Sequence, residues 1–385
     1  MHAVDWRTAA QPSITLEPYL DAIAERGPEG RQQRKIPDAS IADLKASGFI
    51  RSLVPQRWGG LEVTPQEFFT AQIEIAERDM STAWVAGIIA VHAFQLALMD
   101  EQAQRDVYGK DPDACISSSY NPVGGKTERA EGGIMLSGRW AWSSGCDHCD
   151  WVLLGAIVQD EGYRTFLVPR SDYRIEDTWF SMGLQATGSN DIIIEQPVFV
   201  PDYRSHKQMD GFNCLNEQSN PMYNIPWAQT FVRVVSSPAI GAARHALKLF
   251  IDNANTSSTD MTRLVGDPDV QRRVVEAEHL IDQAETMMLR NFDAMMRRVN
   301  AGEEVPMIDR VRYRYQASVV INDMMKAVDL LFDVAGGRSV YEGSAIQEIW
   351  HDIHIARAHV ANSPVAFARN WGNMMLGGEN QDVFV

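Results

Sequence analysis

Hydrophobic residues follow a helical spacing in the first and last parts of the chain and a strand-like spacing between them. From about residue 16 to residue 109, apolar positions recur every three or four residues. Between about 114 and 203, short runs rich in Val, Ile, Tyr, Phe and Trp are separated by Gly, Asp and Pro, as in strands joined by turns. After residue 226 the helical spacing returns in four stretches, at about 227–256, 268–300, 306–335 and 344–375.

This pattern predicts an α+β protein that is mostly helical and has three domains. We expect an N-terminal helical domain over residues 1–113, a central β domain of about six or more strands over 114–212, and a C-terminal four-helix bundle over 213–385. Four long helices with short connections are typical of a bundle. No internal repeat and no low-complexity tract interrupts this order.

Composition and charge narrow the class of protein. The 385 residues are 45% hydrophobic and carry a net charge of -16, which argues against nucleic acid, because its phosphates are bound by clustered Lys and Arg. The first residues lack a basic start followed by an apolar core, and no window approaches about 18 uninterrupted apolar residues. With four cysteines and no disulfide framework, we expect a cytoplasmic protein that binds neither nucleic acid nor membrane.

The segment 138–151 concentrates candidate chemistry. It contains three tryptophans, the adjacent hydroxyls of Ser143 and Ser144, and the pair Cys146 and Cys149. Tryptophan beside hydroxyl donors favours a planar apolar ligand, whereas the cysteines suggest a metal or redox site. A structural zinc site needs about four ligands, and no second Cys or His pair has the matching spacing. We therefore predict no metal site and a structural role for both cysteines.

Two further groups of residues have informative spacings. Trp84 and His92 are eight residues apart on one predicted helix that Ser81 caps, and just over two helical turns put both side chains on one face. A core tryptophan and a satisfied core histidine are the alternative interpretation of this pair. Histidine also recurs late in the chain, in the run 350–354, Trp-His-Asp-Ile-His, and at His359.

Two loop segments carry weaker signals. Arg263 precedes the run 266–271, Gly-Asp-Pro-Asp-Val-Gln. Ser189 lies in the glycine-containing turn 187–190, before a predicted strand. A surface arginine and an ordinary turn are the alternative interpretations.

Together these motifs, which span nearly the whole chain, resemble the acyl-CoA dehydrogenase fold, in which the central domain is a β-barrel. In finer detail the chain is similar to the oxygenase components of two-component flavin-dependent monooxygenases, the group D aromatic hydroxylases. The resemblance implies flavin contacts from a set of residues on several segments: Trp84, Ser118, Trp142, Ser143, Ser144, Ser189 and Arg263. It also implies catalytic roles for Ser144, as donor to the reactive edge of the flavin, for His92, and for His359, as general base on a phenol or indole proton.

The late histidines differ in what the resemblance assigns to them. His359 corresponds to a histidine that reaches the substrate, whereas His351 stands where the family usually has Arg. On a continuous helix His354 and His359 would lie about 140° apart, so we take His359 as the base, with His354 as the alternative. The implied pocket is dry and walled by Trp84, Trp142 and methionines.

The resemblance implies that reduced FMN or FAD, bound without a covalent link, reacts with O2 to form a flavin hydroperoxide. This species would hydroxylate a hydrophobic aromatic compound of phenolic or indole type. The chain has no Gly-x-Gly-x-x-Gly after a strand, so no nicotinamide site is indicated and a separate flavin reductase would supply the reduced flavin. A homo-oligomer, a tetramer as is usual in the family, is also implied.

Two alternatives remain open. Tyr341-Glu342-Gly343-Ser344 imitates the motif that bears the catalytic base of many acyl-CoA dehydrogenases, yet it precedes the run 350–354, which that motif should follow. A dehydrogenase oxidising an acyl thioester would therefore lack its carboxylate base. The other alternative is a non-catalytic ligand-binding relative that kept the fold and lost the chemistry.

Overall fold

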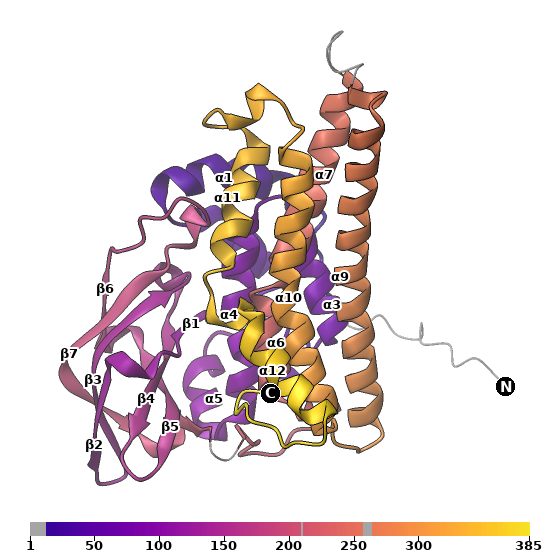
Figure 1. The fold of residues 1–385 in the computed structure, drawn as a ribbon. Helices are drawn as coiled ribbons and strands as arrows, with labels where there is room; N and C mark the ends of the chain where they lie inside the picture. The colour runs from indigo at the N-terminus through magenta and orange to yellow at the C-terminus, as the bar shows by residue number, and fades with distance from the viewer. Residues whose placement is uncertain (1–12, 209–210, 257–263) are drawn as a thin grey trace.

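The structure is a computed structural model that describes residues 13–208, 211–256 and 264–385. Figure 1 shows helices at both ends of the chain order and strands between them, as predicted. The protein is mixed helix and sheet and mostly helical. Five helices precede the strands: α1 (Leu20–Gln33), α2 (Asp38–Ala46), α3 (Pro65–Ala76), α4 (Met80–Leu98) and α5 (Glu101–Tyr108).

Helix α4 lies at the centre of the molecule. All 19 of its residues are buried, so it contacts other elements on every side. By length and composition alone α4 is apolar enough to cross a bilayer, but its complete burial is that of a core helix. The predicted cap, Ser81, is wrong: Asp79 is the N-cap, and its Oδ1 accepts from the N–H of Thr82 at 2.7 Å. The helix thus begins two residues earlier than its hydrophobic pattern indicates.

Eight strands form the β region, and all of them lie within the predicted range 114–212. They are β1 (Ile116–Ser119), β2 (Gly125–Ala130), β3 (Gly133–Ser143), β4 (Trp151–Val158), β5 (Gly162–Pro169), β6 (Arg174–Glu176), β7 (Asn190–Pro201) and β8 (Ser205–Lys207). They make two four-stranded sheets, in the orders β1-β4-β5-β8 and β2-β3-β7-β6. Neither sheet closes on itself, so the expected β-barrel is not observed.

The two sheets share a hydrophobic core. Leu136, Trp140 and Ile192 of one sheet pack with Val152 and Phe166 of the other. Alternate residues of each strand point inward, which is why the strands alternate apolar and polar positions. Burial between two open sheets satisfies the same alternation as a barrel interior, so the sequence pattern does not distinguish the two.

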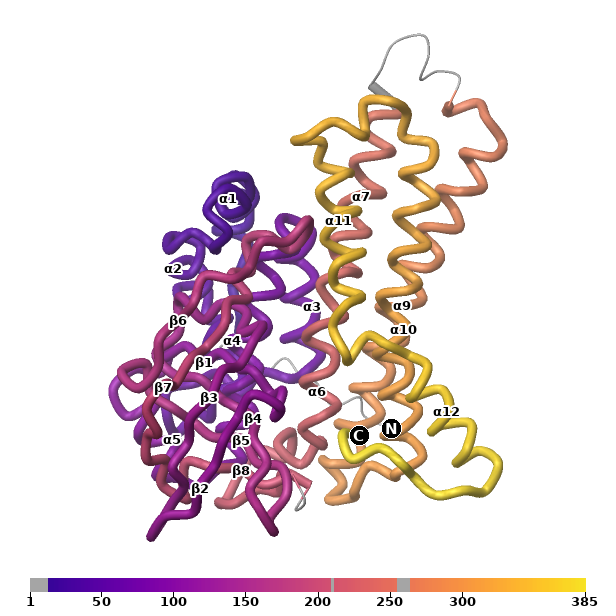
Figure 2. Tube along the Cα trace, turned by 60° about the vertical axis from the view of Figure 1, so that its left-hand side comes forward, coloured from indigo at the N-terminus to yellow at the C-terminus, as the bar shows by residue number. Residues whose placement is uncertain are grey.

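Among the described residues, six helices follow the strands: α6 (Trp227–Val234), α7 (Ser237–Thr256), α9 (Pro268–Asn300), α10 (Met307–Phe332), α11 (Ala345–Ala356) and α12 (Pro364–Met375). Helices α7, α9, α10 and α11 run side by side, and both views place them on the opposite side of α4 from the strands (Figure 1, Figure 2). Two predicted stretches are interrupted. The stretch 227–256 breaks between α6 and α7, and 344–375 breaks over residues 357–363. His359 lies in that second break, so the argument from a continuous helix is wrong.

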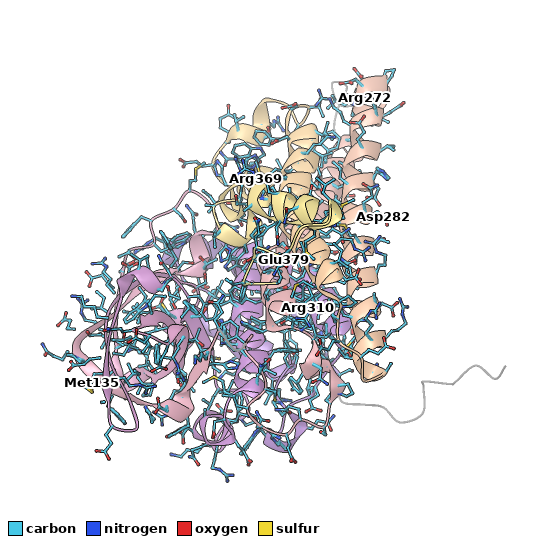
Figure 3. All side chains as sticks on the ribbon, turned by 60° about the horizontal axis from the view of Figure 1, so that its bottom comes forward. Met135, Arg272, Asp282, Arg310, Arg369 and Glu379 are labelled. Carbon is cyan, nitrogen blue, oxygen red and sulfur yellow. The ribbon has the colours of Figure 1, made fainter. Side chains whose placement is uncertain are left out.

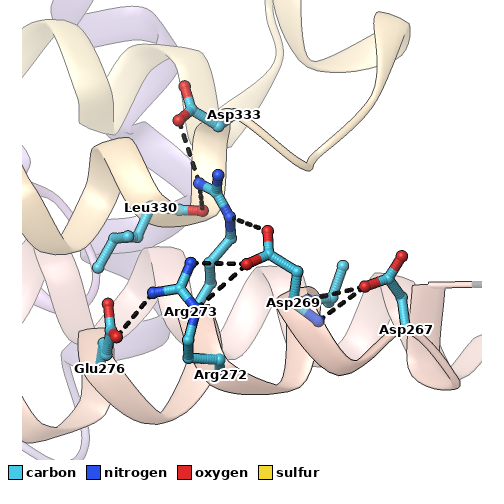
Figure 4. Close-up of polar contacts among 8 residues, drawn as sticks. Asp267, Asp269, Arg272, Arg273, Glu276, Leu330 and Asp333 are labelled. Carbon is cyan, nitrogen blue, oxygen red and sulfur yellow. Dashed lines mark hydrogen bonds and ion pairs between the residues drawn. The ribbon is translucent and has the colours of Figure 1, made fainter.

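An ion-pair network fixes the start of α9 against the end of α10 (Figure 4). Asp267 caps α9 by accepting from the N–H of Asp269 at 2.8 Å. Asp269 accepts from Arg273 Nε at 2.8 Å. Arg273 in turn donates to Leu330 O at 3.3 Å and to Asp333 at 3.1 Å. The run 266–271 therefore begins a helix, with Pro268 at its first position.

Side chains fill the space between the β region and the helices (Figure 3). Met135 of β3 lies at the outer edge of the β region, and Arg272 of α9 lies at the far end of the helical region. The candidate site lies between these extremes, where α4 contacts both parts.

Helices α3 and α7 approach most closely at Gly241, where an added Cβ would lie 2.2 Å from the carbonyl oxygen of Ile73. We expect Gly241→Ala to lower the free energy of unfolding by about 1–3 kcal/mol, because a backbone must move to admit the methyl group. Gly372→Ala in α12 is the matched control: nothing lies within 4 Å of its added Cβ, and alanine favours a helix. Urea denaturation measures both, and equal losses of stability would contradict the close approach.

Candidate active site

A chain of hydrogen bonds joins side chains of α4 and the β region. Trp84 Nε1 donates to Ser144 Oγ at 3.2 Å, and Ser144 Oγ lies 2.8 Å from Ser189 Oγ. Ser189 Oγ lies 2.7 Å from Thr187 Oγ1, which donates to the carbonyl oxygen of Leu184 at 2.9 Å. The structure thus brings together three residues that the sequence predicted from separate segments.

The direction of every bond in this chain follows from its two ends. A carbonyl oxygen only accepts and an indole N–H only donates. Because Thr187 gives its single hydrogen to Leu184, it must accept from Ser189, which then accepts from Ser144. Ser144 accepts from Trp84 in the same way. The Ser144 hydrogen is therefore committed to Ser189 in this arrangement.

The Leu184 end of the hydroxyl chain is anchored to α11. The N–H of Leu184 donates to Asp352 Oδ1 at 2.5 Å, and an added Cβ at Gly183 would lie 2.4 Å from the carbonyl oxygen of His351. Burial, with a smaller contribution from Asp79, raises the pKa of Asp352 to about 7. The His351-Asp352 pair therefore holds the turn that carries the hydroxyl chain.

Trp142 and Ser143 point in opposite directions at the end of β3. Trp142 has a left-handed backbone, with φ 66°, and the register with β7 is irregular between Trp140 and Ser143. As a result the Trp142 side chain is 66% exposed, whereas Ser143 is fully buried. Ser143 Oγ has no hydrogen-bond partner among the described residues.

An aromatic cavity of about 210 Å³ lies beside the hydroxyl chain. Its lining is mostly aromatic, with three polar side chains: Tyr120, Tyr163, Gln208, Phe212, Trp227, Phe231, Arg314, His359, Val360, Ala361 and Phe384. The residues expected to wall the flavin pocket, Trp84, Trp142 and methionines, do not line this cavity; its rings come from several elements, among them α6 and the break after α11. Trp84 meets the cavity through His359, with ring centroids 5.9 Å apart in an edge-on arrangement.

His359 is half-buried at the cavity wall and caps the short turn Val360–Asn362. Its Nδ1 accepts from the N–H of Ala361 at 3.2 Å. Burial, and then the charge of Arg314, lower the pKa of His359 to about 4, so the ring is neutral near pH 7. A neutral ring that accepts at Nδ1 carries its hydrogen on Nε2. His359 therefore offers the cavity a donor.

His92 has the opposite polarity. Its Nδ1 lies 2.9 Å from the carbonyl oxygen of Ile116 and so must donate to it. Nε2 is then a bare acceptor, and it has no partner in the part of the chain that the structure describes. Burial lowers the pKa of His92 to about 4. The rings of Tyr120 and Phe231, which line the cavity, lie 5.8 and 6.2 Å from the His92 ring.

Ser118 is buried in β1, two residues before Tyr120, which directly follows the strand. The Tyr120 hydroxyl donates to Gln95 Oε1 at 2.5 Å, and Tyr163 donates to the carbonyl oxygen of Tyr120 at 2.8 Å. Burial raises the pKa of Tyr120 well above its ordinary value. Tyr120 is thus a protonated, fixed wall of the cavity, whereas Ser118 is not one of the lining residues.

Of the remaining predicted residues, one lies outside the described residues and one lies away from the cavity. Arg263 lies outside the described residues. His354 stacks on Trp350 with ring centroids 3.8 Å apart, and its Nδ1 lies 2.7 Å from the Trp350 carbonyl oxygen. His359 lines the cavity and His354 does not.

Cys146 and Cys149 are buried beside the hydroxyl chain as free thiols. Their Sγ atoms lie 3.7 and 3.3 Å from the carbonyl oxygens of Gly188 and Gly145. Burial raises the pKa of both thiols, which keeps them protonated, whereas metal binding and redox reactions need thiolates. These contacts fit a structural role.

Several cavity residues were missed by the sequence analysis. Trp227 and Phe231 are four residues apart on α6, a spacing that places both rings on one face, and this signal was available. Tyr163, Arg314 and Phe384 come from separate elements, and no local pattern relates them.

Comparison with known proteins finds the same fold and related enzymes. Residues 233–364 match the family described as acyl-CoA dehydrogenase, C-terminal domain. The chain is 37% identical over 360 residues to the flavin-dependent monooxygenase, oxygenase subunit HsaA, of Rhodococcus jostii (strain RHA1), covering 91% of this chain and 94% of that protein. It is 31% identical over 379 residues to the FADH(2)-dependent resorcinol hydroxylase, oxygenase component, of Rhizobium sp. (strain MTP-10005), covering 93% and 92%. The crystal structure of 3-HSA hydroxylase from Rhodococcus sp. RHA1 matches with a TM-score of 0.91 at 35% identity, covering 96% of this chain and 97% of that chain.

The fold is therefore acyl-CoA dehydrogenase-like. Within that fold the chain belongs to the family of oxygenase components of two-component flavin-dependent monooxygenases. It is a flavin-dependent monooxygenase, and the acyl-CoA dehydrogenase alternative is not favoured. Glu342 agrees with this: it is exposed before α11, and no carboxylate lines the aromatic cavity among the described residues.

The buried His92 predicts a pH dependence of stability. Its pKa in the folded protein, about 4, is below the value near 6.5 of an unfolded chain, so the unfolded chain binds the proton first as the pH falls. The His92 contribution is complete above about pH 6.5 and declines toward pH 4, by up to about 3 kcal/mol in free energy of unfolding. His92→Gln should flatten this decline in urea denaturation series. At pH 7.5 His92 is neutral in both the folded and the unfolded protein, so the difference in free energy of unfolding between parent and variant at that pH measures the packing effect alone. Identical slopes of this free energy against pH in the two proteins at low pH would contradict the burial of His92.

Proposed function

We propose that this enzyme uses reduced FMN or FAD and O2 to hydroxylate a hydrophobic aromatic compound, phenolic or indole-type, in the aromatic cavity. A separate flavin reductase supplies the reduced flavin by diffusion. The observation that carries the proposal is the junction of the cavity with the hydroxyl chain, where Trp84 meets His359 at 5.9 Å. The name of the resorcinol hydroxylase relative, which is that of an enzyme acting on a phenol, supports the substrate class.

The flavin contacts fit the residues at the end of β3. The exposed Trp142 offers a flat apolar face, and the buried Ser143 Oγ, without a partner among the described residues, offers a donor. When bound, reduced flavin supplies the electrons that activate O2. Because the Ser144 hydrogen is committed to Ser189, Ser143 is the hydroxyl free to donate to the cofactor. Ser144 then holds Trp84 and Ser189 in place.

The two imidazoles have different roles toward the substrate: one donates a hydrogen bond and the other accepts the proton. His359 Nε2–H donates to the oxygen of a phenol, and the positive charge of Arg314 in the same cavity favours its ionised form. The bare Nε2 of His92, which lies behind the lining residues Tyr120 and Phe231, accepts the proton through one water. The expected role of His359 as base thus passes to His92. The aromatic rings of the cavity exclude other water.

We also propose that α7, α9, α10 and α11 act as a four-helix bundle through which a homotetramer assembles. Exposed apolar side chains on these helices support this proposal, among them Val275 of α9 and Met307 of α10, 67% and 39% exposed. Burial of such side chains between subunits is favourable.

An oxygen-labelling assay tests the reaction. The protein is mixed with chemically reduced FMN or FAD under ¹⁸O2 and offered phenol, 1-naphthol or indole, and mass spectrometry should detect one labelled oxygen atom in a product. His359→Ala should lower the yield by about 100- to 10,000-fold while leaving the Kd of reduced flavin nearly unchanged. His354→Ala is the control and should retain activity. Absence of label from every aromatic, or equal losses in the two variants, would contradict the proposal.

Ser143→Ala tests the flavin contact. Because Ser143 Oγ has no partner in the described structure, the variant should be as stable as the parent or more stable by about 1 kcal/mol. If Ser143 donates to the flavin, the Kd of reduced flavin should rise about 5- to 20-fold in anaerobic titrations. Ser52→Ala is matched, because Ser52 Oγ is also buried and without a partner among the described residues, yet it lies outside the site. Equal flavin affinities in the two variants would place the flavin elsewhere.

A further inference from the structure

We propose that residues 377–385 form a lid over the aromatic cavity, and that the ring of Phe384 sets the size of the aromatic substrate that the closed cavity admits. This inference rests on the proposed function, because it concerns which aromatic compounds reach the same site.

Phe384 is one of the aromatic residues that line the cavity. Its ring centroid lies 5.9 Å from that of Phe231 and 6.4 Å from that of Phe212, both in edge-on arrangements. These are ordinary distances for aromatic pairs, which contribute about 0.5–1.5 kcal/mol beyond burial. The ring itself is only half-buried. Phe384 is therefore a wall with cavity on one side and solvent on the other.

The chain reaches this position by reversing after α12. Gly377 has a left-handed backbone, with φ 92°, and its N–H and that of Gly378 donate back to the last turn of the helix. An added Cβ at Gly378 would lie 2.4 Å from Asn373 Oδ1. Figures 1 and 2 both show the segment looping back from the end of α12 toward α6. The reversal carries Phe384 from the outside of the helical region to the cavity.

Few contacts hold the segment in place. Asn370 Nδ2 donates to Asn380 Oδ1 at 2.8 Å, and Asn370 Oδ1 accepts from the N–H of Gln381 at 2.8 Å. Asn373 Nδ2 donates to the carbonyl oxygen of Glu379 at 2.7 Å. Within the described chain, no backbone-to-backbone hydrogen bond joins residues 379–385 to another segment. A segment held by a few side-chain bonds opens at low cost in free energy.

The inner side of the segment carries a charge that faces Arg314. Asp382 Oδ2 is buried and has no hydrogen-bond partner among the described residues. Arg314 donates to the carbonyl oxygen of Ala361 at 3.0 Å and lies over the ring of Phe367, 3.5 Å from its centroid. Asp382 partly offsets the effect of burial on the pKa of Arg314, which still falls to about 10. The attraction draws the segment inward, so the closed state is favoured when the cavity holds no ligand.

The closed cavity is small for a polycyclic ligand. Its volume, about 210 Å³, is below the roughly 300–1,000 Å³ typical of pockets for larger organic molecules. One aromatic ring fits without a change, whereas a second fused ring needs the Phe384 side chain to move. Displacement of Phe384 is therefore the step that distinguishes small from large substrates.

Two substitutions of Phe384 should act in opposite directions. We expect Phe384→Ala to raise kcat/KM for 1-naphthol relative to phenol by at least about tenfold, and to release more hydrogen peroxide per reduced flavin as water enters. Phe384→Trp should lower the same ratio below that of the parent. Val383→Ala is the control, because the Val383 side chain is 79% exposed on the same segment. If both Phe384 variants keep the parent's ratio of kcat/KM for 1-naphthol to kcat/KM for phenol, the proposal is overturned.

A third variant separates a movable lid from a fixed wall. Asn370→Ala removes two of the bonds that hold the segment and leaves the cavity lining unchanged. It should shift the naphthol-to-phenol ratio in the same direction as Phe384→Ala, by about two- to fivefold, and should speed amide exchange over 379–385. If Phe384→Ala shifts the ratio and Asn370→Ala does not, the segment is a fixed wall and the lid is overturned.

Binding measurements keep this test independent of the reaction. If the parent enzyme hydroxylates neither probe, the proposed function fails, and the Kd values of 1-naphthol and phenol then decide on the lid. A naphthol Kd about tenfold lower in Phe384→Ala than in the parent, with the phenol Kd unchanged, supports the lid. Equal naphthol affinities in the two proteins overturn it.

Discussion

The complete burial of α4 is the constraint on which the rest of the structure depends. A helix that is apolar on every side must be covered on every side, and here the β region covers one flank while the long helices cover the other. The β region supplies the hydroxyls that bond to Trp84 of α4, and both covering parts supply the lining of the aromatic cavity. Trp84 and His92 lie near both parts because they belong to α4, which contacts both. The site is thus a consequence of how a single helix is covered.

Burial also determines the chemistry of the two histidines. Each ring loses its charge on entering the protein, and then a single backbone group determines where its remaining hydrogen lies. The Ile116 carbonyl oxygen faces His92, and the Ala361 N–H faces His359. Two side chains of the same type therefore present an acceptor and a donor to the same region. This asymmetry requires no charged partner, which suits a cavity lined by aromatic rings.

The sequence predicts the residues that lie within one motif better than those that meet from several. The pairing of Trp84 with Ser144 and Ser189 was predictable, since each belongs to a local pattern with a family counterpart. The position of His359 in the sequence was predicted. The break between α11 and α12 in which it lies was not, because the residues on both sides have helical spacing. Open sheets were not distinguished from a barrel, because both bury alternate residues. Phe384 and Arg314 meet only through tertiary packing, and the direction of each imidazole depends on backbone groups far away in the chain.

The hydroxyl chain from Trp84 to Leu184 has a single polarity, since each hydrogen points away from the indole. No member of the chain can reverse alone, because two neighbouring hydrogens would then face each other or two lone pairs would. If the Ser144 hydroxyl changes the direction in which it donates, the hydroxyls of Ser189 and Thr187 must therefore reorient with it. Thr187 does not line the cavity, yet its bond to one carbonyl oxygen fixes the direction of every bond in the hydroxyl chain. Replacement of the Thr187 hydroxyl by a methyl group would allow the hydrogen bonds of the chain to reverse direction. It would therefore change which serine donates to the cofactor.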